Sequence, residues 1–319
     1  MQEIESLYRL KIEPRLAPIL SKQKQLRKEY FLTGLAFIAV AGIVIPLFTT
    51  QNLFLIIPLL VALGLTIMQI IKANKLFKEF RSDFKKAVVN EIVKAVNPDW
   101  VYEPDTMINP AIYAQSDIFR TQYDRYMGDD YVKGVIEKTD FECSELHTEY
   151  MQVTHDSKGH RHEEYVTIFK GLFFNADFNK EFKGKTYVSP DFAEKILGKF
   201  VRNFQGFTGA APLVQLENVE FEKVFVVHST DQIEARYILT PAIMEAMLRI
   251  QQQINCDVHF SFIGSRVYCA LGIAKNLFEP KVFGSVTDIT DVKNMHQLFE
   301  INKLIIHELN LNTRIWTKY

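Results

Sequence analysis

The sequence has few cysteines, little net charge and no basic domain. Its three cysteines, Cys143, Cys256 and Cys269, are far apart and include no CxxC pair, which excludes a disulfide framework and a cysteine zinc site. The formal net charge of the 319 residues is -1, and a nucleic-acid-binding domain is normally basic. We therefore expect reduced cysteines, no cofactor and no nucleic-acid partner.

Two stretches match part of a motif with known chemistry but lack a residue that the motif requires. Gly184-Lys185-Thr186 matches the end of a phosphate-binding Walker loop, yet Asn179 stands where the first glycine is required. His307-Glu308 begins a zincin pattern, yet Leu311 stands where the second histidine is required. Neither motif is complete, so the sequence favours a protein that is not an enzyme.

Charge is also missing from two long apolar runs near the N-terminus. Residues 31–49 and 53–71 contain no Asp, Glu, Lys, Arg or His. A helix of about nineteen residues rises about 28 Å, close to the roughly 30 Å of hydrocarbon in a bilayer. The short link between the runs forces the two helices to be antiparallel. We predict a transmembrane helical hairpin over residues 31–71, with the lipid bilayer as a partner.

Basic residues flank both runs and are absent from the link between them. The absence of ionisable residues inside the runs disfavours transport and favours an anchor. By the positive-inside rule, both termini should be cytoplasmic in a multi-pass protein. The flanking cations would also lie near lipid headgroups. They are Lys22, Lys24, Arg27 and Lys28 before the first run, and Lys72, Lys75, Lys78 and Arg81 after the second.

The pattern divides the chain into four segments. We predict a cytoplasmic N-terminal helical segment over residues 1–30, the hairpin over 31–71, an amphipathic stalk helix over 72–97 and a soluble domain over 98–319. The stalk stripe should pack on the N-terminal segment or the soluble domain, and a homo-oligomer formed through this stripe is the alternative. The stripe consists of Leu76, Phe77, Phe80, Phe84, Val88, Ile92 and Val96.

The soluble domain reads as groups of strands separated by helices, which favours an α+β fold with an antiparallel sheet and packed helices. We predict helices after Pro110, Ser189-Pro190 and Thr240-Pro241, and a last one over 288–309. The predicted strands are Tyr131–Glu137, Glu142–Val153, Tyr165–Asn175, Lys185–Val188, Glu220–His228, Glu234–Leu239, Asp257–Ile263 and Arg266–Ile273.

Two groups of polar residues are candidate sites. His155, His160 and His162 could gather a metal ion, although a solvated hairpin tip would have the same composition. Asp231, Glu234 and Arg236 could form a recognition or catalytic patch, whereas the alternative is a structural ion pair with Arg236. Neither group has a substrate positioned against it by the sequence.

The soluble domain contains the phrases Met127–Gly134, Phe169–Phe178, and Asp231–Pro241 with Met244-Glu245. Together they resemble an uncharacterised bacterial family, in which a basic two-span segment precedes a domain of unknown function. This resemblance implies a protein of the bacterial inner membrane, and it supplies no activity and no functional residues.

The sequence therefore favours a membrane-tethered cytoplasmic module that binds or scaffolds another protein at the membrane. One alternative is an enzyme with an unrecognised site in the soluble domain. Another is a sensor of lipid or envelope stress that uses the basic stalk.

Overall fold

The computed structural model describes residues 2–155, 160–191 and 211–309. The chain divides into two compact units, and each is described here by itself. A helical unit contains Met1–Ala95 and Phe278–His296, and a sheet unit contains Val96–Leu277 and Gln297–Tyr319. A long helical region followed by an antiparallel sheet with helices confirms the predicted α+β class.

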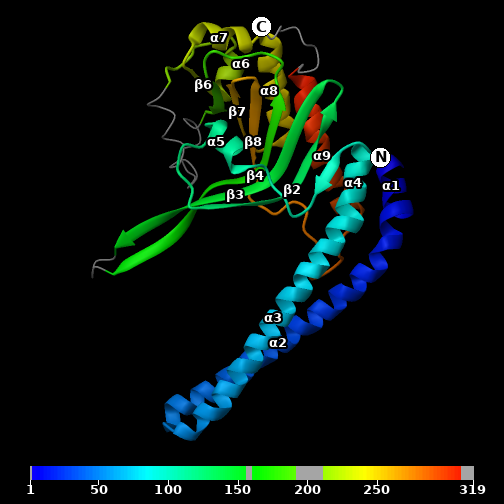
Figure 1. Cartoon of the computed structure of the whole chain (residues 1–319), viewed down its shortest axis with the longest axis vertical. Helices are drawn as coiled ribbons and strands as arrows, with labels where there is room; N and C mark the ends of the chain where they lie inside the picture. Colours follow the sequence, from blue (N-terminus) through cyan, green and yellow to red (C-terminus); the bar gives the residue numbers. More distant parts are fainter. Residues whose placement is uncertain (1, 156–159, 192–210, 310–319) are drawn as a thin grey trace. The chain divides into compact units, whose positions relative to one another are not determined.

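The helical unit consists of two long helices with short segments at their ends. The helices α2 and α3 run side by side as an antiparallel hairpin (Figure 1). Gln51 has a left-handed backbone with φ 52°, and the Asn52 side chain caps the next turn at the Phe54 N–H. The segments are α1 (Gln2–Leu7), the π-helical η1 (Tyr8–Ile12), the 3-10 turn η2 (Glu13–Arg15), α2 (Leu16–Thr50), the 3-10 turn η3 (Leu53–Leu55), α3 (Ile56–Phe84), the π-helical η4 (Lys85–Val89) and α4 (Asn90–Val96).

The two apolar runs lie in α2 and in the segment from η3 through α3. Both helical stretches are long and apolar enough to cross a membrane, by length and composition. Their apolar side chains face outward: Phe48 is 79% exposed and Phe54 is 85% exposed. Exposed apolar surface of this extent is unusual in a soluble monomer.

The predicted stalk stripe is mostly buried within one copy of the chain. Phe80, Phe84, Val88 and Ile92 are each 0% exposed. A second copy is therefore not needed to cover this part of the stripe. The helical path continues from α3 through η4 and α4 and ends at Val96, as Asn97-Pro98 predicts.

The sheet unit contains one eight-stranded sheet in the order β1-β2-β3-β4-β8-β7-β5-β6, and all neighbouring strands are antiparallel. The ends of β3 and β4 extend as a two-stranded ribbon beyond the other strands (Figure 1). The strands are β1 (Val101–Glu103), β2 (Arg125–Ile136), β3 (Thr139–His155), β4 (Arg161–Asp177), β5 (Thr186–Pro190), β6 (Phe225–Ser229), β7 (Asp257–Ile263) and β8 (Arg266–Gly272).

Most predicted helices of the soluble domain are found near their expected positions. The Thr240 hydroxyl caps α8 by accepting a hydrogen bond from the Ile243 N–H at 3.3 Å, and Pro241 occupies the first turn. The α9 helix begins in the helical unit and ends in the sheet unit. The helices are α5 (Pro110–Gln115), α6 (Val219–Glu222), α7 (Gln232–Ile238), α8 (Pro241–Ile254) and α9 (Ile289–Glu308).

Two predicted strands and one predicted helix start were wrong. The range Glu234–Leu239 lies mostly in the helix α7, because the Asp231 side chain caps its first backbone N–H groups. The first part of Glu220–His228 belongs to α6, which Asn218 caps at the Phe221 N–H, and only the rest is strand. Ser189 and Pro190 end β5, and the remainder of the helix predicted after them lies outside the described residues.

An aromatic core beneath α5 supports the part of the sheet unit where polar groups gather. Tyr113 of α5 is 3% exposed, and its hydroxyl lies 2.9 Å from the Thr148 hydroxyl of β3. Cys143 and Cys269 are buried in strands, as predicted for core residues, whereas Cys256 is half-buried and lies between α8 and β7. The buried members of the aromatic core are Ile108, Tyr113, Ile118, Leu146, Phe169, Phe173, Tyr268 and Ala270.

Candidate functional site

The short helix α5 ends by turning Asp117 toward the strand β5. The Asn109 side chain caps the helix start by accepting a hydrogen bond from the Ala111 N–H at 2.8 Å. At the other end, the Ser261 hydroxyl of β7 donates to the Ser116 carbonyl at 2.7 Å. Asp117 then has a φ of 50°, a left-handed conformation that Asp and Asn tolerate better than most residues. The helix cap, the Ser261 hydrogen bond and the left-handed backbone together determine the direction of the Asp117 side chain.

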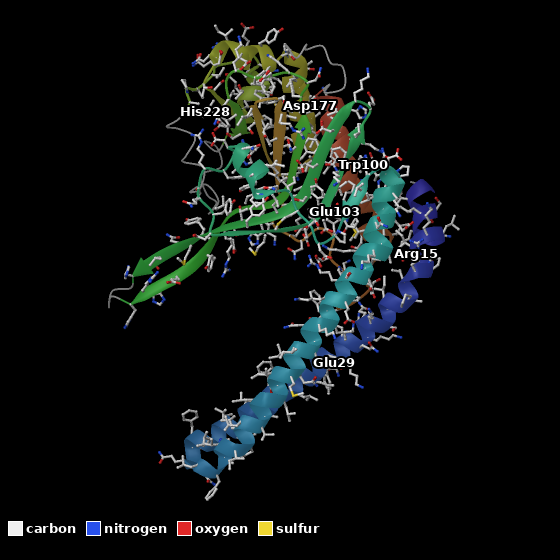
Figure 2. All side chains as sticks on the ribbon, viewed as in Figure 1. Arg15, Glu29, Trp100, Glu103, Asp177 and His228 are labelled. Atoms are coloured by element: carbon white, nitrogen blue, oxygen red, sulfur yellow. The ribbon has the colours of Figure 1, made fainter. Side chains whose placement is uncertain are left out.

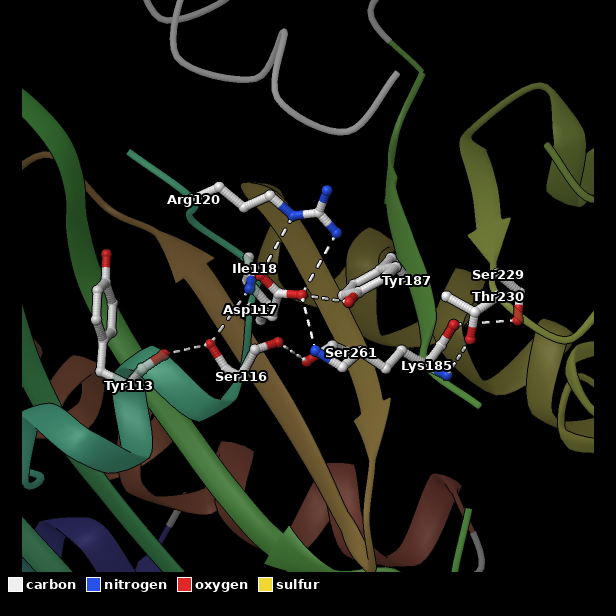
Figure 3. Close-up of polar contacts among 10 residues, drawn as sticks. All are labelled: Tyr113, Ser116, Asp117, Ile118, Arg120, Lys185, Tyr187, Ser229, Thr230 and Ser261. Atoms are coloured by element: carbon white, nitrogen blue, oxygen red, sulfur yellow. Dashed lines mark hydrogen bonds and ion pairs between the residues drawn. The ribbon is translucent and has the colours of Figure 1, made fainter. Parts of the chain in front are cut away.

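Three donors from two segments surround the Asp117 carboxylate (Figure 3). The Tyr187 hydroxyl donates to Oδ2 at 2.5 Å, and the Lys185 Nζ lies 3.3 Å from the same oxygen. The Arg120 Nε donates to Oδ1 at 3.2 Å. Lys185 and Tyr187 are two positions apart, and side chains at that spacing on an extended strand share a face. We call Asp117, Arg120, Lys185 and Tyr187 the Asp117 cluster.

The charges of the Asp117 cluster set the protonation states at neutral pH. Burial alone would raise the pKa of Asp117, but the hydrogen bond from Tyr187 and the charges of Arg120 and Lys185 outweigh it and lower the pKa below its ordinary value. Burial, and then the hydrogen bond to Asp117, raise the pKa of Tyr187. Asp117 is therefore an ionised acceptor and Tyr187 a neutral donor.

A surface pocket of about 520 Å³ adjoins the Asp117 cluster. Arg266 at its wall is held in place, because its Nε donates to Asn175 Oδ1 at 2.8 Å and its guanidinium pairs with Asp140 at 2.6 Å. The volume falls within the usual range of roughly 300–1,000 Å³ for small-ligand sites. The lining residues are Ala114, Gln115, Asp117, Lys185, Ile263, Gly264, Ser265, Arg266 and Tyr268.

The structure does not bring the predicted patch of Asp231, Glu234 and Arg236 together as one group. Asp231 accepts hydrogen bonds from the Ile233 and Glu234 N–H groups, both at 3.0 Å, as the cap of α7. Arg236 donates to the carbonyl and side chain of Gln232 within the same helix, at 3.3 and 3.4 Å. These contacts stabilise α7 locally, and they include no pair between Arg236 and either carboxylate.

Glu234 instead supports the chain that leads into the Asp117 cluster. Its carboxylate accepts hydrogen bonds from the Gly184 N–H at 2.7 Å and the Lys183 N–H at 3.2 Å. A Cβ at Gly184 would lie 2.8 Å from the Asp231 Cβ, which explains the glycine. The incomplete Walker motif therefore has a packing reason, and Lys185 beside it is the residue that reaches Asp117.

The three predicted metal ligands lie near the tip of the β3–β4 ribbon, one at the end of β3 and two around the start of β4. His155 ends β3, His162 lies in β4 and His160 directly precedes β4. His162 is the register partner of Thr154, so the side chains of His155 and His162 project from opposite faces of the ribbon. Metal binding by this set stays a prediction, and one ion would have to connect the two faces.

Half of the predicted membrane-flanking cations form contacts within the helical unit. Lys22 pairs with Asp83 at 2.6 Å, Lys72 with Glu29 at 2.7 Å and Arg81 with Glu279 at 2.7 Å, while Arg27 donates to the Val282 carbonyl at 2.7 Å. Within the described ranges, the other four form no ion pair. These are Lys24, Lys28, Lys75 and Lys78.

Residues 167–311 match the model of a family described as "Protein of unknown function (DUF3137)". The match runs from β4 to beyond α9 and includes Lys185, Tyr187 and Arg266, but not Asp117 or the helical hairpin. The match agrees with the predicted domain of unknown function.

Comparisons with individual proteins add no function. No curated protein matches the chain. Among solved structures, the chain is similar to the crystal structure of the mycobacterial trehalose monomycolate transport factor A, TtfA, at 10% sequence identity and a TM-score of 0.29. That similarity covers 68% of this chain and 93% of the other. Likeness at this level carries no argument about fold or function.

Proposed function

We propose that this chain is a membrane-anchored binding module, whose hairpin resides in a bacterial inner membrane and whose sheet unit binds a small polar ligand on the cytoplasmic side. The observation that carries the ligand part is the pocket beside the Asp117 cluster. Its charged side chains are already oriented by neighbours, so a ligand would meet a preorganised site.

The anchor part rests on the exposed apolar side chains of the hairpin. In water these side chains would leave a large apolar surface uncovered, whereas a bilayer covers it at no cost to the helical hydrogen bonds. The basic residues at the open end of the hairpin support cytoplasmic termini. The four segments predicted from the sequence, at 1–30, 31–71, 72–97 and 98–319, are part of this proposal.

The donors left over in the pocket indicate what kind of ligand it accepts. Lys185 has three donor hydrogens and contacts Asp117, and Arg266 has five donor hydrogens and contacts Asp140 and Asn175. Asp117, by contrast, already accepts from three partners. Among these three charged side chains the remaining hydrogen-bonding capacity is mainly that of donors, so they favour a ligand with acceptor oxygens, such as a carboxylate or a phosphate.

The test uses the full chain purified in mild detergent. Native mass spectrometry and thermal-shift titration with small carboxylates and phosphates would be compared among the wild type, the double variant D117N/K185Q and the control K223Q. Asn tolerates the left-handed backbone at position 117, so the double variant should fold. Lys223 is an exposed lysine of the same unit that pairs only with Glu220 at 2.7 Å in the described structure.

We expect a ligand that binds the wild type and K223Q and binds D117N/K185Q at least about tenfold more weakly, a loss typical of one or two charged hydrogen bonds. Equal binding by all three proteins would contradict the pocket assignment. Alkaline extraction of membranes tests the anchor separately, and release of the chain into the supernatant would contradict it.

A protein partner at the membrane is the second candidate, and the β3–β4 ribbon favours it. Beyond the Arg125–Glu149 register pair, β3 pairs with β4 alone among the described strands. Free strand edges can accept a strand from another protein. Crosslinking from a cysteine placed at Gln152 of the ribbon would test this candidate, with one at Lys223 as the control site.

A further inference from the structure

A second pocket, of about 380 Å³, lies between α2 and α3 at the open end of the hairpin. Figure 2 labels Glu29, one of its residues, on α2. The pocket is confined to the helical unit, and it is distinct from the pocket beside Asp117. Its lining residues are Gln25, Lys28, Glu29, Lys72, Lys75, Leu76 and Glu79.

The lysines of this pocket are not equivalent. Lys72 is neutralised by Glu29, whose carboxylate lies 2.7 Å away and whose side chain is only 11% exposed. Glu79 lies 3.9 Å from Lys22 on α2. Lys28 and Lys75 are exposed and form no ion pair in the described part of the chain. The pocket therefore presents two ammonium groups without an ion pair, one from each helix, and its lining holds three lysines against two glutamates.

The depth of these two lysines matches that of lipid phosphates. Lys28 lies three residues before the apolar run that begins at Phe31, which is about 4.5 Å along the helix axis. Lys75 lies four residues after the run that ends at Ile71, which is about 6 Å. The headgroup layer on each side of the hydrocarbon is about 5–7 Å thick. Both ammonium groups would thus reach the layer that contains the phosphates.

We infer that the pocket binds the phosphate group of an anionic phospholipid between Lys28 and Lys75. The Gln25 amide supplies a further donor at the same opening, and Leu76 supplies an apolar wall for the glycerol end of an acyl chain. The Glu29–Lys72 ion pair connects the two helices at this level. This inference rests on the proposed membrane anchor.

The remaining flanking cations provide a matched control. Lys24 and Lys78 belong to the same two helices, are exposed and are free of ion pairs in the described residues, but they do not line the pocket. The variants K28Q/K75Q and K24Q/K78Q therefore remove the same charge from the same flank. Lys24 and Lys78 lie seven residues from the apolar runs, which is about 10 Å, so a pure surface-charge effect would lower binding in both variants, by somewhat less in K24Q/K78Q.

The experiment titrates the full chain in detergent micelles with phosphatidylglycerol, phosphatidylcholine and inorganic phosphate, and native mass spectrometry counts the bound molecules. Each lysine near an anionic headgroup should contribute about fivefold in affinity. We expect K28Q/K75Q to bind phosphatidylglycerol about tenfold or more weakly than the wild type, and K24Q/K78Q to bind it within about twofold. The variant K28R/K75R should retain binding. Circular dichroism would verify that each variant is helical.

Three outcomes would overturn the inference. Equal losses in K28Q/K75Q and K24Q/K78Q would show a general basic flank, and phosphatidylcholine bound as tightly as phosphatidylglycerol would show no selection for net negative charge. Inorganic phosphate bound as tightly as the lipid would show a soluble anion as the ligand. Alkaline extraction distinguishes these results from failure of the anchor, because a chain that stays in the membrane without a lipid preference contradicts only this inference.

Discussion

The Tyr187 hydroxyl donates a hydrogen bond to the Asp117 carboxylate at 2.5 Å, although the two residues are 70 positions apart in the chain. One residue follows the short helix α5, and the other lies in the strand β5. Their contact joins the irregular segment before β2 to the far half of the sheet, next to the pocket. Lowering of the Asp117 pKa is the measurable consequence of this contact and of the two nearby cations.

The first prediction concerns acid stability. Because the pKa of Asp117 is lower in the folded chain than in the unfolded chain, the stability that it contributes is fully present above the unfolded pKa. That contribution is lost as the pH falls through the lowered folded pKa. The melting temperature of the full chain in detergent should therefore exceed that of D117N at about pH 7, and the difference should shrink toward about pH 3.

The variant Y187F sharpens this test. It removes the hydrogen bond from Tyr187 that helps to lower the Asp117 pKa, so Asp117 is protonated at a higher pH. The difference in melting temperature between Y187F and Y187F/D117N should therefore be lost at a higher pH than the difference between the wild type and D117N. A difference between the wild type and D117N that does not depend on pH would show that Asp117 acts through packing and not through its charge.

The second prediction concerns the close approach of β4 and β8. Gly171 has a φ of 150°, and a Cβ there would lie 1.9 Å from the Leu271 carbonyl oxygen. G171A should therefore separate the two strands and reduce the free energy of unfolding by about 3 kcal/mol or more. Gly272 is its register partner, but a Cβ there would lie 3.5 Å from the nearest atom. G272A should cost less than about 1 kcal/mol.

Thermal melts of the full chain in detergent, with far-ultraviolet circular dichroism, would compare the two alanine variants. Similar melting temperatures for G171A and G272A would contradict the steric argument, because only one of the two positions is closed to a side chain.

Local signals explain which elements the sequence predicts well. The apolar runs form helices because each is long and uncharged, and Thr240-Pro241 starts α8 through its own cap and ring. The error at Glu234–Leu239 was avoidable. Asp231 at the cap and Glu234 three residues later form the pattern of a capping box, which outweighs the apparent alternation of apolar residues.

The candidate site was not predictable in the same way. The Asp117 cluster joins residues from α5 and β5, and no spacing along the chain relates Asp117 to Tyr187 or Arg266. The sequence identified Lys185 as part of an incomplete Walker motif, but its role in the site comes from its contact with Asp117 in the folded chain. The pairing of β5 with β7 and β6, which places these residues together, is non-local and leaves no periodic signal.

The third prediction concerns the contact between α2 and the segment before α9. Arg27 donates from Nε to the Val282 carbonyl at 2.7 Å and also contacts the Gly284 carbonyl, and Gln23 donates to the Lys281 carbonyl at 2.7 Å. Loss of charged hydrogen bonds of this kind costs about 2 kcal/mol. R27Q should therefore lower the melting temperature of the full chain by about 5 °C.

Lys24 is the control for Arg27, since it is an exposed cation on the same helix without a hydrogen bond in the described residues. K24Q should melt within about 1 °C of the wild type, as most exposed substitutions do. Limited proteolysis at Phe283, which is 70% exposed, should be faster in R27Q than in K24Q. Equal cleavage rates would mean that Arg27 does not hold this segment.

The last prediction concerns the free part of the β3–β4 ribbon. Its base is fixed where the Arg125 guanidinium lies 3.3 Å from the centre of the Tyr165 ring and 3.5 Å from Glu149. Beyond that point, residues 150–155 and 161–166 pair only with each other among the described strands. A two-stranded ribbon is marginally stable by itself, whereas β7 and β8 have partners on both edges.

Amide hydrogens in the free part should therefore exchange at least about a hundredfold faster than those of β7 and β8, as for other locally unfolding segments. Hydrogen exchange with mass spectrometry on the full chain in detergent would measure both. The change from fast to slow amide exchange along the ribbon should occur near Glu149 and Tyr165. At this point β2 begins to pair with β3, and Arg125 contacts both residues. Protection of the ribbon equal to that of β7 and β8 would mean that another copy or a co-purifying partner covers its edges, and dilution of the sample would then restore fast exchange.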